Sequence, residues 1–485
     1  MNWFDAIARL AVKAVFMPAV LRWLLGQRVW AVAALTWRAA FRFRLFWVLA
    51  ALLLLSVVGL PLLLKNDGTA QGFIQIMLTY TLSVVTALLA FSTLWLSCGT
   101  LARDIEECQM QVVAVKPIAR WQIWLGKLLG ITLLNFTLLA FSGVSIYGLL
   151  YWRARQLPEA QQRILHQEIF VARAALREPL PDLDAEVDAT LGTNPEFSSL
   201  APAQQQETRF QLKERIRATH QIVAPNHYRK WVIDLGLKRH LIGDEPLFLR
   251  AKFHVAQTNA SGSYLGLWRI GPFENPIAFS PPQSLAPNTF HEVKLDSARK
   301  LLDDQGRLII NFENRNQTAV MFPLEDGLEV LYREGGFATN LARGLGIILC
   351  SLTLVAALGL AAASLMSFPV AAFFSISLLL VGLSSGTLTS VVHEGTVGGV
   401  DHESGAGTTG WIDIVLLPVF KAILWVVNLV QQFSPVDALS SGRTVAWGDL
   451  GLAFVKIVLL LGGILAALGM YFFTRRELAA TQAHT

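Results

Sequence analysis

Residues 103–127 read RDIEECQMQVVAVKPIARWQIWLGK, a charged and amphipathic stretch that lies between two strongly apolar runs, 76–98 and 128–151. Each run is long enough to cross a bilayer core as a helix, which takes about 20 residues. Charged side chains are costly at bilayer depth, so the stretch between the runs is expected on the membrane surface. Nothing in it is catalytic, and it therefore presents a surface for a soluble partner.

The composition is that of an integral membrane protein. The chain has 485 residues, of which 53% are hydrophobic and 15% charged, against about 25% charged in a soluble domain. The apolar runs predict six transmembrane helices, at 45–64, 76–98, 128–151, 341–365, 369–392 and 450–473. The basic residues cluster beside these runs and not along one polar face, which argues against nucleic acid as a partner.

Basic residues also predict the orientation, because loops on the cytoplasmic side are enriched in Lys and Arg. They precede the first run (Arg38, Arg42, Arg44), separate the second from the third (Arg103, Lys116, Arg120, Lys127) and follow the sixth (Arg475, Arg476). With six spans, all three places fall on one side. We therefore expect both termini in the cytoplasm, the chain in the cell inner (plasma) membrane, and the polar region 152–340 outside.

Two segments leave alternatives open. Residues 411–430 are apolar enough for a seventh span, although four of them are unfavourable in one: Asp413, Pro418, Lys421 and Asn428. A seventh span would also place the basic C-terminal pair on the wrong side of the membrane. A re-entrant or interfacial helical hairpin on the outer face is the preferred interpretation, because protein can cover it there. Residues 1–34 are interpreted as an interfacial amphipathic helix, with an additional span as the alternative.

The polar region divides in two by its residue pattern. Residues 152–227 are rich in Gln, Glu, Arg and Ala and predict a helical arm, with helices over 158–177 and 203–219. The acidic, proline-bearing segment 178–195 between them predicts a loop. Residues 228–340 contain short alternating runs, at 231–233, 247–255, 264–268, 307–312 and 319–322. Such runs predict an antiparallel β-sandwich, so that the external insertion is α+β.

No motif for catalysis is present. Gly126-Lys127 is followed by Leu128, whereas a phosphate-binding loop needs Ser or Thr after the Gly-Lys pair. The chain is therefore not expected to be an enzyme, and neither a catalytic residue nor a cofactor is predicted.

Two groups of residues have a functional and a structural interpretation. The cluster His393, Glu394, Asp401, His402 and Glu403 contains metal-ligand types, but its spacing matches no zinc motif and its glycine-rich surroundings favour a flexible outer loop. Trp231, Trp268 and Phe273 would form a stacking platform for a glycan if they were exposed. Aromatic residues in alternating strands are more often core. No disulfide framework is expected, since Cys98, Cys108 and Cys350 all lie in or beside the apolar runs.

The order of residues within 103–127 resembles the hallmark cytoplasmic loop of ABC-2 type transporter permeases. A turn of Arg103, Asp104, Glu106 and Glu107 is followed by Lys116-Pro117-Ile118-Ala119-Arg120, and then by Gly126-Lys127 at the start of the next span. Residues 34–44 resemble the family's first helix, and residues 433–450 together with Arg475-Arg476-Glu477 resemble its final outer loop and last span. The chain departs from the family at Cys108-Gln109, where relatives usually carry Lys or Arg and Thr, and in the size of its insertion. On composition alone, 99–127 is either an ordinary inside loop or an elbow bent at Pro117, because proline disfavours helix in the residue before it.

The resemblance implies a function and partners. Such permeases pair as homodimers or heterodimers, and each receives a separate cytoplasmic ABC ATPase against its elbow, so the chain is expected to be the transmembrane subunit of a bacterial exporter. The residues implied in ATPase coupling are Arg103, Asp104, Glu106, Glu107, Lys116, Pro117 and Arg120. The alternative is a non-transporting membrane anchor or mechanotransmitter, which couples cytoplasmic ATP hydrolysis to an envelope protein or glycan through the external domain.

Overall fold

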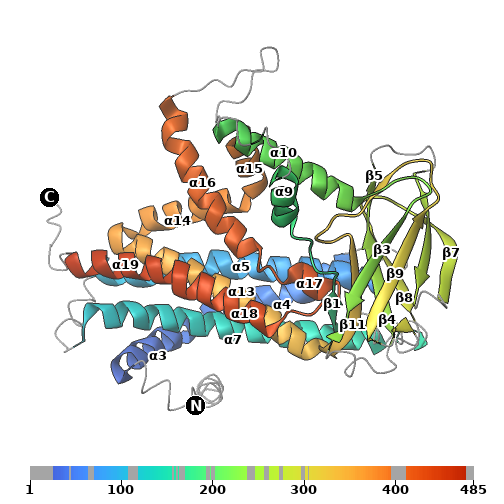
Figure 1. Cartoon of the computed structure of the whole chain (residues 1–485). Coiled ribbons are helices and arrows are strands. Elements are labelled where there is room, and N and C mark those ends of the chain that lie inside the picture. The colour runs from blue at the N-terminus through green and yellow to red at the C-terminus, as the bar shows by residue number, and fades with distance from the viewer. Residues whose placement is uncertain are drawn as a thin grey trace. The chain divides into compact units, whose positions relative to one another are not determined.

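The computed structural model of the chain (Figure 1) describes residues 26–42, 45–63, 70–107, 118–155, 170–192, 202–236, 246–255, 262–271, 277–295, 301–303, 305–394 and 411–476, with the single residues 158, 159, 162 and 197. The chain divides into two compact units. Unit 1 comprises Met1–Phe170 and Gly336–Thr485 and is helical, and unit 2 comprises Val171–Gly335 and contains the β-sheets.

Unit 1 is built from apolar helices. They are α3 (Gln27–Arg42), α4 (Leu45–Leu63), α5 (Ala70–Glu106), α7 (Arg120–Arg155), α13 (Phe337–Leu365), α14 (Phe368–Leu383), α15 (Ser385–Glu394), α16 (Trp411–Gln431), α17 (Val436–Ser440), α18 (Trp447–Ala453), the π-helix η3 (Phe454–Gly462) and α19 (Gly463–Arg475). A helix pairs its backbone N–H and C=O groups within one segment, which is what apolar surroundings require.

Five helical stretches among the described residues are long and apolar enough to cross a membrane. They are Gln75–Glu106, Arg120–Arg155, Phe337–Leu365, Leu416–Ser440 and Trp447–Arg475. A sixth is reached if α3 and α4, which are bent by 66° relative to each other, count as one broken span. Four of the predicted spans lie within these stretches. The prediction of a multi-pass helical membrane protein with a β-rich insertion is thereby confirmed in outline.

The structure differs from the prediction in the last third of the chain. The predicted fifth span, 369–392, is divided at Ser384 into α14 and α15. Helix α14 has 16 residues, about 24 Å at 1.5 Å per residue, and is shorter than a hydrocarbon core of about 30 Å. Residues 411–431 form one continuous helix, α16, with Pro418 inside it. Most of α16 belongs to one of the five candidate spans, and a re-entrant arrangement of this segment stays a prediction.

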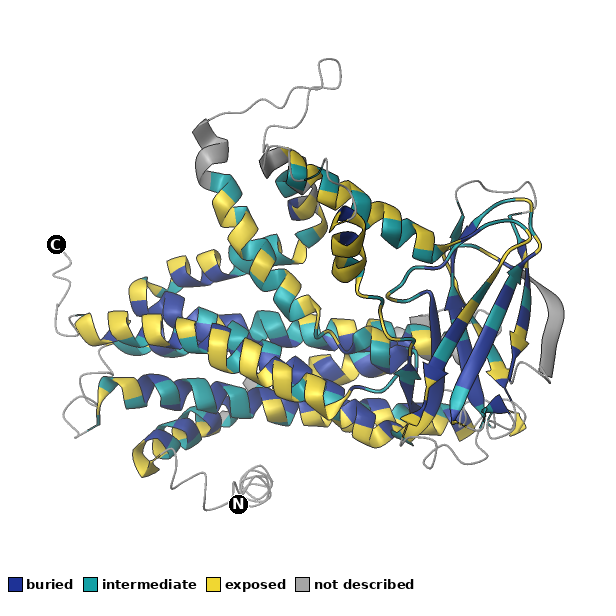
Figure 2. Ribbon diagram, in the orientation of Figure 1, coloured by how far each residue is buried: buried dark blue, intermediate teal, exposed yellow. Residues whose placement is uncertain are grey.

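Helix α13 is the most deeply buried of the candidate spans (Figure 2), with 61% of its apolar window buried. Its small residues allow neighbouring helices to approach closely. A Cβ added to Gly359 would lie 1.9 Å from Ser97 Oγ of α5, and Cys98 Sγ lies 3.5 Å from the carbonyl oxygen of Gly359. Cys98 and Cys350 are buried free thiols, and Cys108 lies outside the described residues.

Helix α3 packs against α7 along two glycines. A Cβ on Gly126 would lie 2.6 Å from Val32 Cβ, and a Cβ on Gly130 would lie 2.7 Å from the carbonyl oxygen of Ala33. On α3, Val29, Ala33 and Trp37 recur at helical spacing and are buried. Of the predicted interfacial segment 1–34, residues 27–34 therefore belong to a bundle helix with one face buried, and residues 1–25 lie outside the described residues.

We expect Gly130→Leu to displace α3, because the new side chain would overlap the backbone of α3. Overpacking of this kind costs about 1–3 kcal/mol. Hydrogen exchange over residues 27–42 of the purified chain should become faster. Gly148→Leu is the matched control on the same helix, since nothing lies within 4 Å of a Cβ at Gly148. Equal protection of α3 in both variants would show that its docking does not depend on Gly130.

The described residues of unit 2 form two helices and three sheets. The elements are β1 (Val171–Leu176), α9 (Leu183–Gly192), α10 (Pro202–Gln221), β2 (Ile222–Val223), β3 (Tyr228–Asp234), β4 (Leu247–Lys252), β5 (His254–Val255), β6 (Tyr264–Ile270), β7 (Ile277–Leu285), β8 (Phe290–Leu295), β9 (Arg307–Asn314), β10 (Val320–Met321) and β11 (Leu328–Gly336). The strand orders are β1-β11-β4-β8, β2-β10-β5 and β3-β9-β6-β7. The pairs β2–β10, β5–β10, β4–β11, β4–β8, β6–β7, β6–β9 and β3–β9 are antiparallel, and the register of the last runs from Tyr228↔Glu313 to Asp234↔Arg307.

One hydrophobic core takes side chains from all three sheets, with aromatic rings at its centre. The rings of Trp231 and Trp268 stack with centroids 6.1 Å apart, and Phe322 meets both edge-on. Trp231 is 3% exposed and Trp268 is 6% exposed. The glycan-platform interpretation is therefore wrong for these two residues, because the core leaves no ring face for a sugar. Phe273 lies outside the described residues.

The predicted helical arm 152–227 is only partly helical. Strand β1 lies within the predicted helix 158–177, because Ala174 and Leu176 are buried in the β core. Helix α9 lies within the predicted loop 178–195, where Asp182 Oδ1 accepts a hydrogen bond from Ala185 N at 3.1 Å and caps the first turn. Ion pairs join α9 to α10: Asp184–Lys213, Asp188–Arg209 and, when the imidazole is protonated, Glu186–His220. Helix α10 agrees with the predicted helix 203–219.

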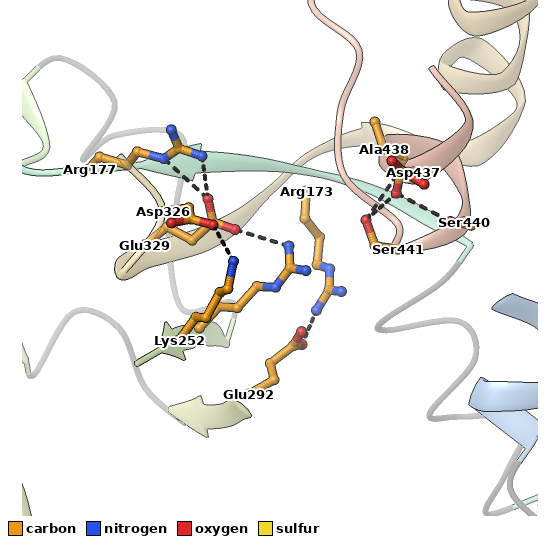
Figure 3. A network of polar contacts seen from close by, with 11 residues as sticks. Arg173, Arg177, Lys252, Glu292, Asp326, Glu329, Asp437, Ala438, Ser440 and Ser441 are labelled. Atoms are coloured by element: carbon orange, nitrogen blue, oxygen red, sulfur yellow. Dashed lines mark hydrogen bonds and ion pairs between the residues drawn. The ribbon is translucent and has the colours of Figure 1, made fainter. Parts of the chain in front are cut away.

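A network of charged side chains lies on the β1-β11-β4-β8 sheet (Figure 3). Its centre is Glu329, whose side chain is 1% exposed. Glu329 accepts hydrogen bonds from Arg177 Nη2 at 2.9 Å and from Arg250 Nη1 at 3.0 Å. Beside it, Arg173 pairs with Glu292, and Lys252 pairs with Asp326 at 2.9 Å. The carboxylate therefore links β11, β4 and the residue after β1.

Candidate functional site

The ends of five helices of unit 1 are joined by charged side chains, and we call this arrangement the end network. It lies where α5 ends, α7 begins, α13 ends, α14 begins and α19 ends. Segment 108–117, which connects α5 to α7, lies outside the described residues. The end network therefore includes residues at both ends of segment 108–117, which is the undescribed part of the predicted elbow 99–127.

Lys127 joins α7 to α5. Its ammonium Nζ donates to Asp104 Oδ2 and to the carbonyl oxygen of Thr100, both at 2.6 Å. The Lys127 side chain is 8% exposed and that of Asp104 is 33% exposed. The Thr100 carbonyl lies six residues before Glu106, the last residue of α5. Lys127 therefore bonds both a side chain and a backbone carbonyl oxygen of α5.

Two guanidinium groups extend the end network to α19 and α13. Arg120 Nη1 donates to the carbonyl oxygens of Phe473, Thr474 and Arg476, at 3.3, 2.8 and 2.9 Å. Arg476 Nη1 in turn reaches the carbonyl oxygens of Ala363, Ser364 and Met366, at 3.1, 3.3 and 3.4 Å. Both contacts place a cation on the C-terminal carbonyl groups of a helix. The start of α7 is therefore linked to the end of α19, and through Arg476 to the end of α13.

Glu106 and Arg103 join α5 to the start of α14. Glu106 Oε1 accepts a hydrogen bond from Phe368 N at 2.8 Å. A carboxylate at this position is favoured by the free N–H groups and the positive dipole end of a helix. The guanidinium of Arg103 lies 4.4 Å from the centre of the Phe368 ring, and Trp95 meets the same ring edge-on at 5.1 Å.

The structure brings together four of the seven residues predicted for ATPase coupling: Arg103, Asp104, Glu106 and Arg120. Their side chains contact other helices of the same chain. Glu107 is exposed in the turn after α5. Lys116 and Pro117 lie outside the described residues, so the bend predicted at Pro117 stays a prediction.

Sequence reasoning missed Lys127, Arg476 and Phe368 as members of the end network. From the sequence, Lys127 and Arg476 are markers of orientation and parts of the resemblance to ABC-2 permeases, and neither is predicted to bond another helix. One indication was present for Lys127, since a Lys at the beginning of an apolar run needs a partner when it is buried. The partners of Arg476 are backbone carbonyl groups more than 100 residues away in the sequence, and no residue pattern indicates them.

The charged groups of the end network hold helix ends in position relative to one another. These groups contact helix ends and one another. Within the part of the chain that the structure describes, no group of three or more His, Cys, Asp or Glu residues is placed to hold a metal ion. Of the predicted cluster, His393 and Glu394 end α15, whereas Asp401, His402 and Glu403 lie outside the described residues.

Comparisons of the chain with protein-family models, with curated proteins and with solved structures found no match.

Proposed function

We propose that this chain is the transmembrane permease subunit of an ABC transporter of ABC-2 type, an exporter driven by a separate cytoplasmic ATPase. The observation that carries the proposal is the end network, which ties α5, α7, α13, α14 and α19 together at the end where segment 108–117 emerges. In this proposal the network lies on the cytoplasmic side of the inner membrane, where both termini also lie. Two permease subunits and two ATPase subunits would form the complete transporter.

The lengths of α5 and α7 support the proposal. Their candidate spans have 32 and 36 residues, about 48 and 54 Å at 1.5 Å per residue. A hydrocarbon core is about 30 Å thick, so both helices extend beyond it. A soluble protein can bind and displace a helix end that extends into water.

The contacts of the end network would transmit a displacement from segment 108–117 to the spans. A force on segment 108–117 would act first on Glu106 and Arg120, since these residues end α5 and begin α7. Glu106 is bonded to α14, and Arg120 to the end of α19. A displacement of the elbow would therefore move the spans together, as an ATP-driven stroke requires.

The test is affinity purification of the tagged chain from its native membranes, with mass spectrometry and an ATP hydrolysis assay. We expect a co-purifying polypeptide with a phosphate-binding loop, in equal amount to the chain. Glu107→Lys should lower the recovery of this polypeptide at least about tenfold. A reversed charge at an interface costs several kcal/mol, and each tenfold change in the dissociation constant corresponds to about 1.4 kcal/mol.

The matched control is Glu207→Lys, which makes the same change at an exposed position of α10. It should leave recovery unchanged. If no ATPase is recovered with the unaltered chain, or if Glu107→Lys retains it fully, the proposal is wrong.

A second candidate function is the mechanotransmitter, and one observation favours it. Unit 2 is a compact unit with its own hydrophobic core, larger than a loop between two spans requires. The two functions differ in what stimulates ATP hydrolysis by the reconstituted complex. A transported small molecule would stimulate the exporter, whereas only an envelope protein or glycan bound to unit 2 would stimulate the mechanotransmitter.

A further inference from the structure

An apolar groove runs between α7 and α13, away from the end network. It encloses about 410 Å³, within the roughly 300–1,000 Å³ typical of small-molecule sites. Its lining is almost entirely apolar, and it includes Phe136, Ala140 and Tyr147 of α7 and Ala338, Ala342 and Leu349 of α13. Helices α7 and α13 lie against each other here, since a Cβ on Gly143 would lie 2.4 Å from Leu345. The groove therefore belongs to unit 1 alone.

The groove has the dimensions of one lipid leaflet. On α7 it extends from Phe136 to Tyr147, about 16 Å at 1.5 Å per residue. Half of a hydrocarbon core of about 30 Å is about 15 Å. Several side chains along it remain exposed, among them Phe136, Val144 and Tyr147, although α7 is a candidate span. A groove of this length on a span accepts an acyl chain lying parallel to the helices.

One end of the groove leads to a polar group. Tyr147, Tyr151 and Arg155 follow one another at intervals of four residues on α7, and such positions share a helix face. Arg155 Nη2 donates to the Tyr151 hydroxyl at 3.0 Å, and its guanidinium lies 4.4 Å from the centre of the Tyr151 ring. Tyr151 and Trp152 are exposed, and exposed aromatic residues at the end of a span mark the membrane–water interface.

This geometry places a cation at headgroup depth above an apolar groove. A guanidinium carries five N–H donors in a fork that matches a phosphate group. Side chains on a helix lean toward its N-terminus, so Tyr151 and Arg155 lean toward the groove. The arrangement is complementary to an amphiphile with one negative headgroup and an acyl chain.

We infer that the α7–α13 groove binds an anionic phospholipid of the bilayer, with its acyl chain between the helices and its phosphate at Arg155 and Tyr151. The inference stands apart from the proposed ATPase coupling, since it uses neither the end network nor segment 108–117. A lipid held here would fix the spacing of α7 and α13.

The test is native mass spectrometry of the full-length chain in detergent, titrated with phosphatidylglycerol or with phosphatidylcholine of the same acyl chains. We expect the unaltered chain to retain phosphatidylglycerol about fivefold better. Arg155→Gln should abolish this preference, a loss of about 1 kcal/mol at 1.4 kcal/mol per tenfold. Arg28→Gln, at an exposed arginine of α3, is the matched control and should keep it.

A second variant fills the groove. Ala140→Phe with Ala342→Phe places two rings in it from opposite helices, and both alanines are exposed, so the core is not disturbed. We expect retention of both lipids to fall at least about tenfold. Ala51→Phe makes the same change at an exposed position of α4 and should have no effect. Gel filtration of every variant verifies that it remains folded.

Three results would overturn the inference. The first is equal retention of the two lipids by the unaltered chain, because Arg155 would then not distinguish between their headgroups. The second is undiminished lipid retention by the filled variant. The third is a change from dimer to monomer on filling the groove, which would make the groove a contact between two copies of this chain.

Discussion

Glu329→Gln is expected to destabilise unit 2 by about 3–5 kcal/mol, because it removes the buried anionic partner of Arg250 and Arg177 and breaking a buried charge pair is strongly destabilising. The Glu329 side chain is 1% exposed, and its carboxylate accepts from Arg250, whose side chain is 13% exposed, and from Arg177. Figure 3 shows this carboxylate among several charged groups of the sheet. A loss of this size is a large fraction of the 5–15 kcal/mol that stabilises a typical domain.

Hydrogen exchange of the full-length chain measures the effect where it arises. Peptides from β4 and β11 should exchange faster in Glu329→Gln, because these strands pair with each other directly. Glu313→Gln is the matched control: Glu313 also pairs with two arginines, Arg269 and Arg315, but its side chain is 32% exposed and theirs are 50% and 59% exposed. Exposed pairs contribute about 0–1 kcal/mol. Equal effects of the two changes would show that burial does not determine the strength of these pairs.

The outline of the fold could be predicted from the sequence because it depends on local patterns. Long apolar runs predict helices in a membrane, and the alternating runs 231–233, 264–268 and 307–312 lie within β3, β6 and β9. Both patterns are set by residues close together in the chain, so the residue order alone contains them.

What could not be predicted depends on distant partners. Strand β1 has the sequence VARAAL, whose alanines favour a helix, and it becomes a strand through a neighbour in the sheet, β11, more than 150 residues later. Helix α9 was not predicted, because the prolines and acidic residues before it indicate a loop. One of these acidic residues, Asp182, caps the helix. Tertiary pairing overrides local preference at both places.

The candidate site was predicted as a surface and is largely an internal network. The charges of 103–127 indicated a partner, and the resemblance to ABC-2 permeases assigned them to an ATPase. The structure shows Asp104, Glu106 and Arg120 bonded to groups of other helices. The sequence shows that a charged side chain needs a partner. It does not show whether that partner lies on another helix of the same chain or on another protein.

The pair of Asp104 and Lys127 provides the strongest test of the end network. We expect Asp104→Ala to destabilise the bundle by about 3 kcal/mol, because the buried ammonium of Lys127 loses its carboxylate partner and, among the described residues, keeps the carbonyl oxygen of Thr100. Removal of one member of a buried pair costs about 3–5 kcal/mol, and the lower value is expected here because Asp104 is 33% exposed. Thermal unfolding of the detergent-solubilised chain, followed by tryptophan fluorescence, measures the change.

A double variant separates the pair from its members. Asp104→Leu with Lys127→Met replaces both charges by apolar side chains, which is often neutral or stabilising for a buried pair, so it should recover most of the loss. Asp188→Ala removes an exposed pair with Arg209 and should change little, since the two side chains are 60% and 45% exposed. A double variant as unstable as Asp104→Ala would mean that the carboxylate acts through contacts other than Lys127. If instead the double variant is stable but, in the proposed transporter, no longer couples ATP hydrolysis to the spans, then the pair is retained for the coupling of α5 to α7 and not for stability.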